Sequence, residues 1–191
     1  MNKLFFFKIS AIIFFVGCNS NIGESSEIDL KFIALDSEVT GVTFNNELKS
    51  MNDLNIIEYL YYYNGGGVAL GDINNDGLDD IFFSGNEVND QLYLNQGNMV
   101  FKNISKSSGI ANQNNWSTGA SMADVNNDGF IDIYVSTVSD YKNLKGHNRL
   151  YINNGDLTFT ESSKKIGLDF EGFGTHASFF DYDNDGDLDV Y

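Results

Sequence analysis

The sequence predicts an all-β protein, a partial β-propeller built from blades of four antiparallel strands. A nine-residue stretch rich in Asp and Asn occurs three times, beginning at Asp72, Asp124 and Asp181, which are 52 and 57 residues apart. Each of the first two copies is followed by two short alternating apolar runs joined by Asn and Gly, a hairpin signal. No segment shows an apolar period of 3.6 residues over a useful length. Four-stranded repeats of about fifty residues are typical of propeller blades.

Composition and charge narrow the possible functions. The chain has 191 residues, of which 42% are hydrophobic, so it can bury a sizeable core. Its formal net charge of -16 disfavours binding to a nucleic-acid backbone. The three repeated stretches contain twelve of the 27 acidic residues. The acidity is therefore concentrated in local sites rather than spread over a solvated surface.

The first eighteen residues differ in kind from the rest. Lys3 and Lys8 are followed by an apolar run over residues 9–17, which is shorter than the roughly 20 residues of a membrane span. This pattern predicts a secretory signal over residues 1–18. Cys18 is the only cysteine and stands where a bacterial lipoprotein signal places its lipid-modified residue, so we expect a lipid-anchored Cys18. An ordinary cleaved signal with an incidental thiol is the alternative.

The remaining chain is predicted to consist of a short tether and the folded region. Residues 19–28 are small and polar, as in a flexible tether. The incomplete propeller is expected over residues 29–191. Its predicted parts are a closing strand and turn at 29–44, blade 1 at about 64–105, blade 2 at about 116–163, and a truncated blade 3 from about 173.

Each of the two complete blades is predicted to contain four strands. The predicted strands are residues 67–72, 80–85, 91–95 and 99–104 in blade 1, and 119–124, 132–137, 149–153 and 157–162 in blade 2.

A serine four residues before a glycine follows each fourth strand, as in Ser105 and Gly109. Ser37 and Gly41 repeat this spacing, so we expect the run before Ser37 to be a fourth strand that completes another blade. The chain stops at Tyr191, near the start of the second strand of the third unit. We therefore expect a fragment of a longer protein.

The repeated stretches are predicted to be metal-binding hairpin loops between the first and second strands. Side-chain oxygens stand at positions 1, 3, 5 and 9, alternate residues of a curved backbone point to one side, and the carbonyl at position 7 can join them. Glycine at position 6 permits the positive φ that the curvature needs. The predicted ligands are Asp72, Asn74, Asp76, Leu78, Asp80, Asp124, Asn126, Asp128, Phe130, Asp132, Asp181, Asp183, Asp185, Asp187 and Asp189. Such all-oxygen sets fit Ca²⁺, about one ion per complete loop, since calcium takes six or more oxygens.

A plain turn and two helical calcium sites fit these loops less well. A tight Asn-Asp-Gly turn needs no acid at positions 1 and 9. Two carboxylates crowded to about 4 Å repel each other by roughly 1 kcal/mol even in water. A divalent ion between them makes the total electrostatic interaction attractive. An EF-hand needs Glu at position 12, where Phe83 and Val135 stand, and flanking helices. A dockerin-like pair also needs a helix after each loop, whereas the residues that follow these loops favour strands.

Residues 173–191, "FGTHASFFDYDNDGDLDVY", resemble an FG-GAP or VCBS repeat, the calcium-caged blade of the integrin alpha-subunit propeller. Residues 64–83 and 116–135 are similar repeats whose opening Phe-Gly is altered. With its signal, the chain is also similar to lipoproteins of Bacteroidota of the ASPIC/UnbV-containing, cartilage-acidic-protein-like kind. The resemblance covers nearly all of residues 30–191. It implies an exported module, lipid-anchored at the outer membrane or cell surface, that binds an extracellular protein or glycan.

An enzyme acting on polysaccharide, of the lyase or dehydratase type, is the alternative function, and no catalytic residue is assigned. Such chemistry needs a base and a charge stabiliser converging in a cleft. His147 and His176 are the two histidines of the chain. We expect His176 to be a packed strand residue and His147 a solvated loop residue.

Two further segments are candidates for contact with a partner. The loop between the second and third strands of blade 2 is the first choice, with Asp140, Tyr141, Lys142 and Lys145. The aromatic run at residues 59–63 could offer a sugar-stacking surface, although packing in the core or at an interface is the favoured interpretation. Trp116 and Phe173 occupy matching places before a strand and are expected to pack between blades.

Overall fold

A computed structural model describes residues 32–49, 54–110 and 115–191. The signal segment, Cys18 and the tether lie outside the described residues, so the expectations made for them stay predictions. The chain divides into two compact parts, Met1–Ala34 and Leu35–Tyr191. All the elements discussed below belong to the second part, and they form three repeated units.

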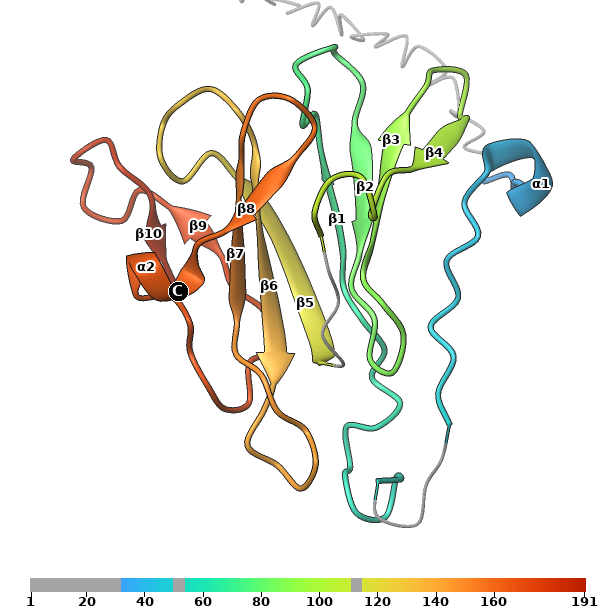
Figure 1. The fold of residues 1–191 in the computed structure, drawn as a ribbon, viewed down its shortest axis with the longest axis vertical. Helices are drawn as coiled ribbons and strands as arrows, with labels where there is room; N and C mark the ends of the chain where they lie inside the picture. Colours follow the sequence, from blue (N-terminus) through green and yellow to red (C-terminus); the bar gives the residue numbers. More distant parts are fainter. Residues whose placement is uncertain (1–31, 50–53, 111–114) are drawn as a thin grey trace, which may run out of the picture. The chain divides into compact units, whose positions relative to one another are not determined.

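Nearly all of the regular secondary structure in the described chain is β-strand (Figure 1). One antiparallel sheet has the order β1-β2-β3-β4, a second has the order β5-β6-β7-β8, and β9 pairs with β10 in a two-stranded hairpin. The elements are α1 (Ser37–Thr40), β1 (Val68–Gly71), β2 (Asp80–Phe83), β3 (Gln91–Asn95), β4 (Phe101–Asn103), β5 (Trp116–Ala123), β6 (Asp132–Val138), β7 (Arg149–Asn153), β8 (Phe159–Glu161), α2 (Ser163–Ile166), β9 (Phe179–Phe180) and β10 (Asp189–Val190). The predicted fold class, a partial β-propeller of four-stranded antiparallel blades, is confirmed.

The predicted strands agree with the observed ones to within a few residues. The third strands, β3 and β7, have the predicted bounds. The first strand of blade 2 begins earlier than predicted, at Trp116 instead of Gly119. The register between β5 and β6 shifts between Ser117 and Gly119, and this bulge lets pairing continue towards Trp116. The sequence rule of strict alternation does not anticipate such an irregularity.

The expected closing strand is not formed in the described residues. Residues 32–36 have no regular structure, and α1 follows at once. A strand is stabilised by hydrogen bonds to a neighbouring strand, and no sheet of the described chain includes this segment. Its pairing with another blade stays a prediction.

The serine-to-glycine spacing corresponds to a single helical turn. In α1, the N–H of Gly41 donates to Ser37 O at 2.7 Å, and in α2 that of Gly167 donates to Ser163 O at 2.8 Å. Both glycines are left-handed, with φ of 76° and 86°, as is usual where a helix ends. The repeated motif therefore closes each blade with a turn rather than with part of a strand.

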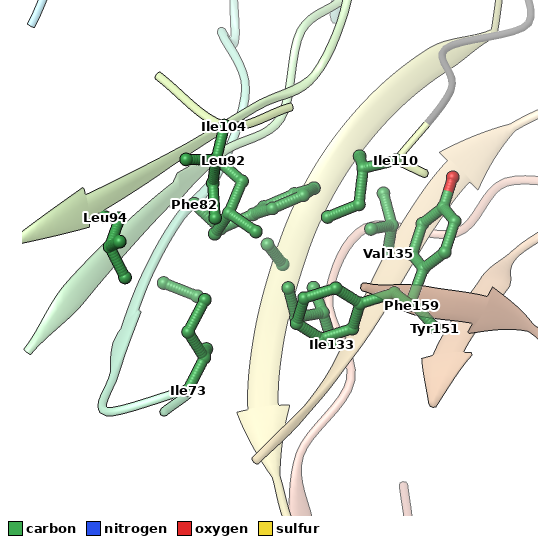
Figure 2. Packing of buried hydrophobic residues seen from close by; sticks show 12 residues of the cluster. Ile73, Phe82, Leu92, Leu94, Ile104, Ile110, Ile133, Val135, Tyr151 and Phe159 are labelled. Atoms are coloured by element: carbon green, nitrogen blue, oxygen red, sulfur yellow. The ribbon is translucent and has the colours of Figure 1, made fainter. Parts of the chain in front are cut away.

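The two complete blades pack face to face, as propeller blades do (Figure 2). One cluster of buried side chains includes Phe82 and Leu92 from the first sheet and Ile133 and Val135 from the second. On the other face of the second sheet, Tyr134 belongs to a cluster that also contains residues of the third unit. Because both of its faces are covered, β6 is buried along its whole length.

At the first strands of successive units and the residues just before them, the backbones approach so closely that a side chain does not fit between them. A methyl group placed on Gly67 would lie 2.7 Å from Ala120 N, and one placed on Gly119 would lie 2.3 Å from Thr175 O. Both distances are shorter than any normal carbon contact. Glycine is therefore required at these two positions for the backbones of neighbouring units to touch.

A buried ion pair also joins blades 1 and 2, and no sequence pattern predicts it. Arg149 Nη2 lies 2.8 Å from Asp90 Oδ2, and both side chains are almost fully excluded from solvent. Asp90 also accepts a hydrogen bond from Gly85 N at 2.9 Å, and Arg149 Nη2 donates to Ser117 Oγ at 2.7 Å. These bonds hold each charge from more than one side, as a buried charge requires.

We expect Asp90→Asn to lower the free energy of unfolding by about 3–5 kcal/mol, because it leaves Arg149 as an uncompensated buried charge. Chemical denaturation monitored by circular dichroism measures this loss. Asp140→Asn is the matched control, since Asp140 and Lys145 are 3.7 Å apart and both exposed. That exposed pair is expected to contribute about 0–1 kcal/mol. Equal losses of stability in the two variants would contradict the stabilising role of the buried pair of Asp90 and Arg149.

Candidate metal centre

Each Asp-rich stretch forms the hairpin between the first two strands of a unit, as predicted. The register pairs Gly71 with Asp80 and Ala123 with Asp132, so position 9 begins the second strand opposite the residue before position 1. In the third unit, Asp189 pairs with Phe180 in the same way. The first and last acids of each loop are thereby brought to its base.

Two residues in each loop have a left-handed backbone. The glycines at position 6, Gly77, Gly129 and Gly186, have φ of 85°, 89° and 94°, which confirms the predicted positive φ. The asparagines at position 4, Asn75, Asn127 and Asn184, have φ of 58°, 56° and 63°. Asparagine tolerates this region better than most residues. The two left-handed residues curl the backbone around the side chains of positions 1, 3 and 5.

The aspartate at position 1 organises the turn through backbone hydrogen bonds. Asp72 accepts from Asp76 N at 3.0 Å and from Gly77 N at 2.7 Å. Asp124 accepts from the corresponding groups of Asp128 and Gly129 at 3.0 and 2.8 Å. Partial burial opposes ionisation of Asp72, but the N–H groups of Gly77 and Asp76 keep its pKa below the ordinary value. The carboxylate at position 1 is thus fixed within the loop by backbone N–H groups.

The third loop repeats this arrangement and shows the clearest cluster of donors. Asp181 accepts hydrogen bonds from Asp185 N at 3.2 Å and from Gly186 N at 3.1 Å. Asp181, Asp183 and Asp189 each place one carboxylate oxygen within 4.8 Å of the others. Positions 1, 3 and 9 therefore converge in this loop as the sequence predicts.

In the first two loops, position 3 is an amide that contacts the carboxylate at position 5. Asn74 Nδ2 donates to Asp76 Oδ2 at 2.9 Å, and Asn126 Nδ2 donates to Asp128 Oδ2 at 2.8 Å. The residue at position 7 donates its N–H to the same position-5 carboxylate, from Leu78 at 2.9 Å and from Phe130 at 2.9 Å. Positions 1, 3, 5 and 7 of these loops thus form one connected group.

The third loop carries two additional acids in contact. Asp187 N donates to Asp185 Oδ1 at 3.1 Å. The Asp185 carboxylate raises the pKa of Asp187, first through a side-chain hydrogen bond and then through its negative charge. A carboxyl group beside a carboxylate holds its proton more tightly, because the neighbour accepts a hydrogen bond from the protonated form and its charge disfavours a second negative charge.

The aspartate at position 9 fixes the base of the loop. Asp80 accepts hydrogen bonds from Ile73 N at 3.0 Å and from Asn95 N at 2.7 Å. Asp132 accepts hydrogen bonds from Val125 N at 3.0 Å and from Asn153 N at 2.8 Å. Both side chains are buried. Burial raises the pKa of Asp80 and of Asp132, although these backbone N–H groups lower it. Asp189, by contrast, is exposed and accepts from Tyr182 N at 2.9 Å.

Sequence reasoning missed two asparagines that support the loops. Asn95 Nδ2 donates to Asp79 O at 2.8 Å, and Asn153 Nδ2 donates to Ile131 O at 3.1 Å. Asn153 Nδ2 also reaches Ile73 O of the neighbouring blade at 2.8 Å. Each asparagine ends a third strand in the repeated run "LYLN" or "LYIN", and this repetition was the signal that could have identified it.

The other candidate residues are placed as follows. His147 is half-buried in the loop after β6. The expectation for His176 was wrong, because it is exposed and precedes β9, while its neighbour Ala177 points into the core. Trp116 is buried as expected, but Phe173 is 57% exposed.

The predicted partner loop is tied to the segment before β1. Tyr141 OH donates to Glu58 O, and Lys142 Nζ pairs with Glu58 Oε2. Lys145 contacts Asp140 within the loop. These bonds give the loop a defined position over the residues around Tyr59.

Four-stranded blades, each with an Asp-rich hairpin between its first two strands, define a repeat protein of the β-propeller class. Residues 72–135 and 137–191 match the family model of the FG-GAP-like repeat, and the chain belongs to this family. The resemblance to FG-GAP repeats noted in the sequence is thereby confirmed.

The chain is also similar to cartilage acidic protein 1. It is 28% identical to the Xenopus tropicalis protein over 178 residues, which cover 91% of this chain and 25% of that protein. It is 31% identical to the Mus musculus protein over 134 residues, which cover 68% of this chain and 20% of that protein. The chain thus spans about a quarter or less of these relatives. Within the described ranges, no helix is long and apolar enough to cross a membrane.

We expect Asn153→Ala to lower the free energy of unfolding by about 1–3 kcal/mol, because buried backbone carbonyls of two blades lose their donor. Denaturation in a calcium-free buffer measures the structural effect alone. Asn154→Ala is the control, since Asn154 is exposed and its side chain bonds only within its own hairpin, to Thr158 and Thr160. A loss in the control as large as that in Asn153→Ala would contradict the supporting role.

Proposed function

We propose that this chain is a calcium-binding β-propeller module of an exported, lipid-anchored protein, and that it binds a protein or glycan outside the cell. The observation that carries the metal site is the convergence of Asp181, Asp183 and Asp189 in the third hairpin. The hairpins at Asp72 and Asp124 share its left-handed turn residues and its backbone hydrogen bonds to position 1. Membership of the FG-GAP-like repeat family favours a propeller-like binding or adhesion module over an enzyme.

The donor chemistry of the loops fits calcium. As metal ligands, the side chains at positions 1, 3, 5 and 9 and the carbonyl at position 7 offer only oxygen. In the third loop the Asp185 carboxylate raises the pKa of Asp187, by a side-chain hydrogen bond and by its negative charge. The ligands would be the fifteen residues predicted from the sequence. A bound Ca²⁺ supplies a positive charge that offsets the crowded carboxylates.

The chain's own residues prepare the loop for the ion. Asp72 and Asp124 hold the turn closed through backbone N–H groups, and Asp80 and Asp132 fix its base against the third strand. These bonds restrict the loop by themselves, which lowers the conformational cost of binding an ion. A single-cysteine protein has no internal disulfide, and cross-links through metal would serve the same stabilising purpose.

Isothermal titration calorimetry tests the metal site. We expect saturable Ca²⁺ binding that the triple variant Asp72→Ala, Asp124→Ala, Asp181→Ala abolishes, with Mg²⁺ binding more weakly because it demands a stricter octahedron. At a free Ca²⁺ concentration of about 100 Kd, each site would add about 2.7 kcal/mol to stability.

The control is Asp79→Ala, Asp140→Ala, Glu171→Ala, which removes the same number of negative charges from exposed positions outside the proposed ligand set. It is expected to retain calcium binding. Equal calcium binding by the wild-type protein and the ligand variant would refute the metal site.

The lipid anchor has a separate test. Cells expressing the chain are expected to incorporate labelled palmitate into it, and Cys18→Ser should release the protein from the membrane fraction. Membrane association and labelling that persist in Cys18→Ser would refute the anchor. Cleavage of polysaccharide by the full-length protein would instead favour the enzyme alternative.

A further inference from the structure

An aromatic cleft lies at the end of the blades opposite the Asp-rich hairpins. It has a volume of about 500 Å³ and is lined by Tyr59, Tyr61, Trp116 and Phe173. Trp116 begins β5, and Val138, which ends β6, also lines the cleft, whereas the hairpin loop joins the other ends of these two strands. We refer to this site as the aromatic cleft.

The rings of the aromatic cleft are held in place by one another. The ring of Tyr59 lies edge-on to Trp116, with centroids 5.7 Å apart, and 5.6 Å from that of Tyr141. Tyr141 in turn lies 5.8 Å from Phe173. The bond from Tyr141 OH to Glu58 O fixes the loop that carries this ring. Rings fixed in this way lose little freedom when a ligand binds.

Two of the lining rings are left uncovered. The side chains of Tyr61 and Phe173 are 61% and 57% exposed, although both residues adjoin a well-packed aromatic cluster. Trp116 and Tyr59, in contrast, are 1% and 6% exposed. The aromatic cleft therefore combines a rigid interior with two rings available at its rim.

Neutral hydrogen-bonding groups surround these rings. Asn64 and Thr175 are exposed lining residues, and Thr118, also in the lining, donates to Gly174 O at 2.7 Å. Among the described residues that line the aromatic cleft, none has a charged side chain. Its volume falls within the range of about 300–1,000 Å³ typical of small-molecule sites.

We propose that the aromatic cleft binds a neutral sugar unit of a glycan. A sugar ring presents apolar C–H faces, which pack on the exposed rings of Tyr61 and Phe173, and hydroxyl groups, which suit the amide and hydroxyl groups of Asn64 and Thr175. The net charge of -16 disfavours anionic saccharides. This inference rests on the proposed binding function and names the ligand class.

The fluorescence of Trp116 provides a direct test, because it is the only tryptophan of the chain. The probes are cellotetraose, xylotetraose, laminaritetraose and chitotetraose, titrated in buffer containing Ca²⁺, with choline as a competing probe. We expect a saturable change in Trp116 emission with at least one tetrasaccharide. Choline uses aromatic faces through cation–π contact, so a response to choline alone would overturn the proposal. No saturable response to any tetrasaccharide would overturn it as well.

Substitutions at the rim locate the site. Tyr61→Ala and Phe173→Ala are expected to weaken saccharide binding by about tenfold each, whereas Tyr61→Phe, which keeps the ring, should stay within about twofold. Tyr63→Ala is the matched control, since Tyr63 is 65% exposed in the same segment but does not line the aromatic cleft. A loss in Tyr63→Ala equal to that in Tyr61→Ala would overturn the assignment.

Calcium calorimetry on the same samples separates the two proposals. Calcium binding without any saccharide response would refute only the sugar site. A saccharide response that depends on Tyr61, in a protein that does not bind calcium, would refute only the metal centre.

Discussion

Direct backbone contact between successive units, in their first strands and the residues just before them, is the constraint on which the rest of the structure depends. At Gly67 and Gly119 no side chain fits between the backbones of neighbouring units, so the units stack closely at these two residues. This closeness lets Phe82 and Leu92 of one blade meet Ile133 and Val135 of the next across a continuous core. The sheets themselves are small, and a four-residue strand such as β2 is stabilised mainly by what covers its two faces.

In the described molecule, the carboxylates and the aromatic rings lie at opposite ends of the stacked strands. The turn after each first strand gathers carboxylates, and the other ends of the strands gather aromatic rings. The proposed ligands of each Asp-rich loop come from nine consecutive residues, whereas the aromatic cleft combines residues from the segment before β1, from β5 and β6, and from the third unit. The first kind of site takes its ligands from a single blade, while the second exists only once blades have packed together.

This difference explains which features the sequence could predict. The bounds of β3 and β7 and the positive φ of Gly77 follow from local patterns, namely alternation and an Asn-Asp-Gly turn. The pair of Asp90 and Arg149, 59 residues apart, depends on which blade faces meet, and no local pattern specifies that. The same limitation applies to His176, which is exposed and lies before the short strand β9.

Contacts between loops of adjacent blades have a thermodynamic consequence. Asn75 Nδ2 donates to Gly129 O at 3.0 Å, so a side chain of one turn holds the glycine at which the next turn bends. When binding of an ion orders one turn, the neighbouring turn therefore loses less conformational entropy when it binds an ion in its turn. If the turns take up cations, saturation should be cooperative, with a Hill coefficient above one, and replacing the amide of Asn75 should make the turns independent.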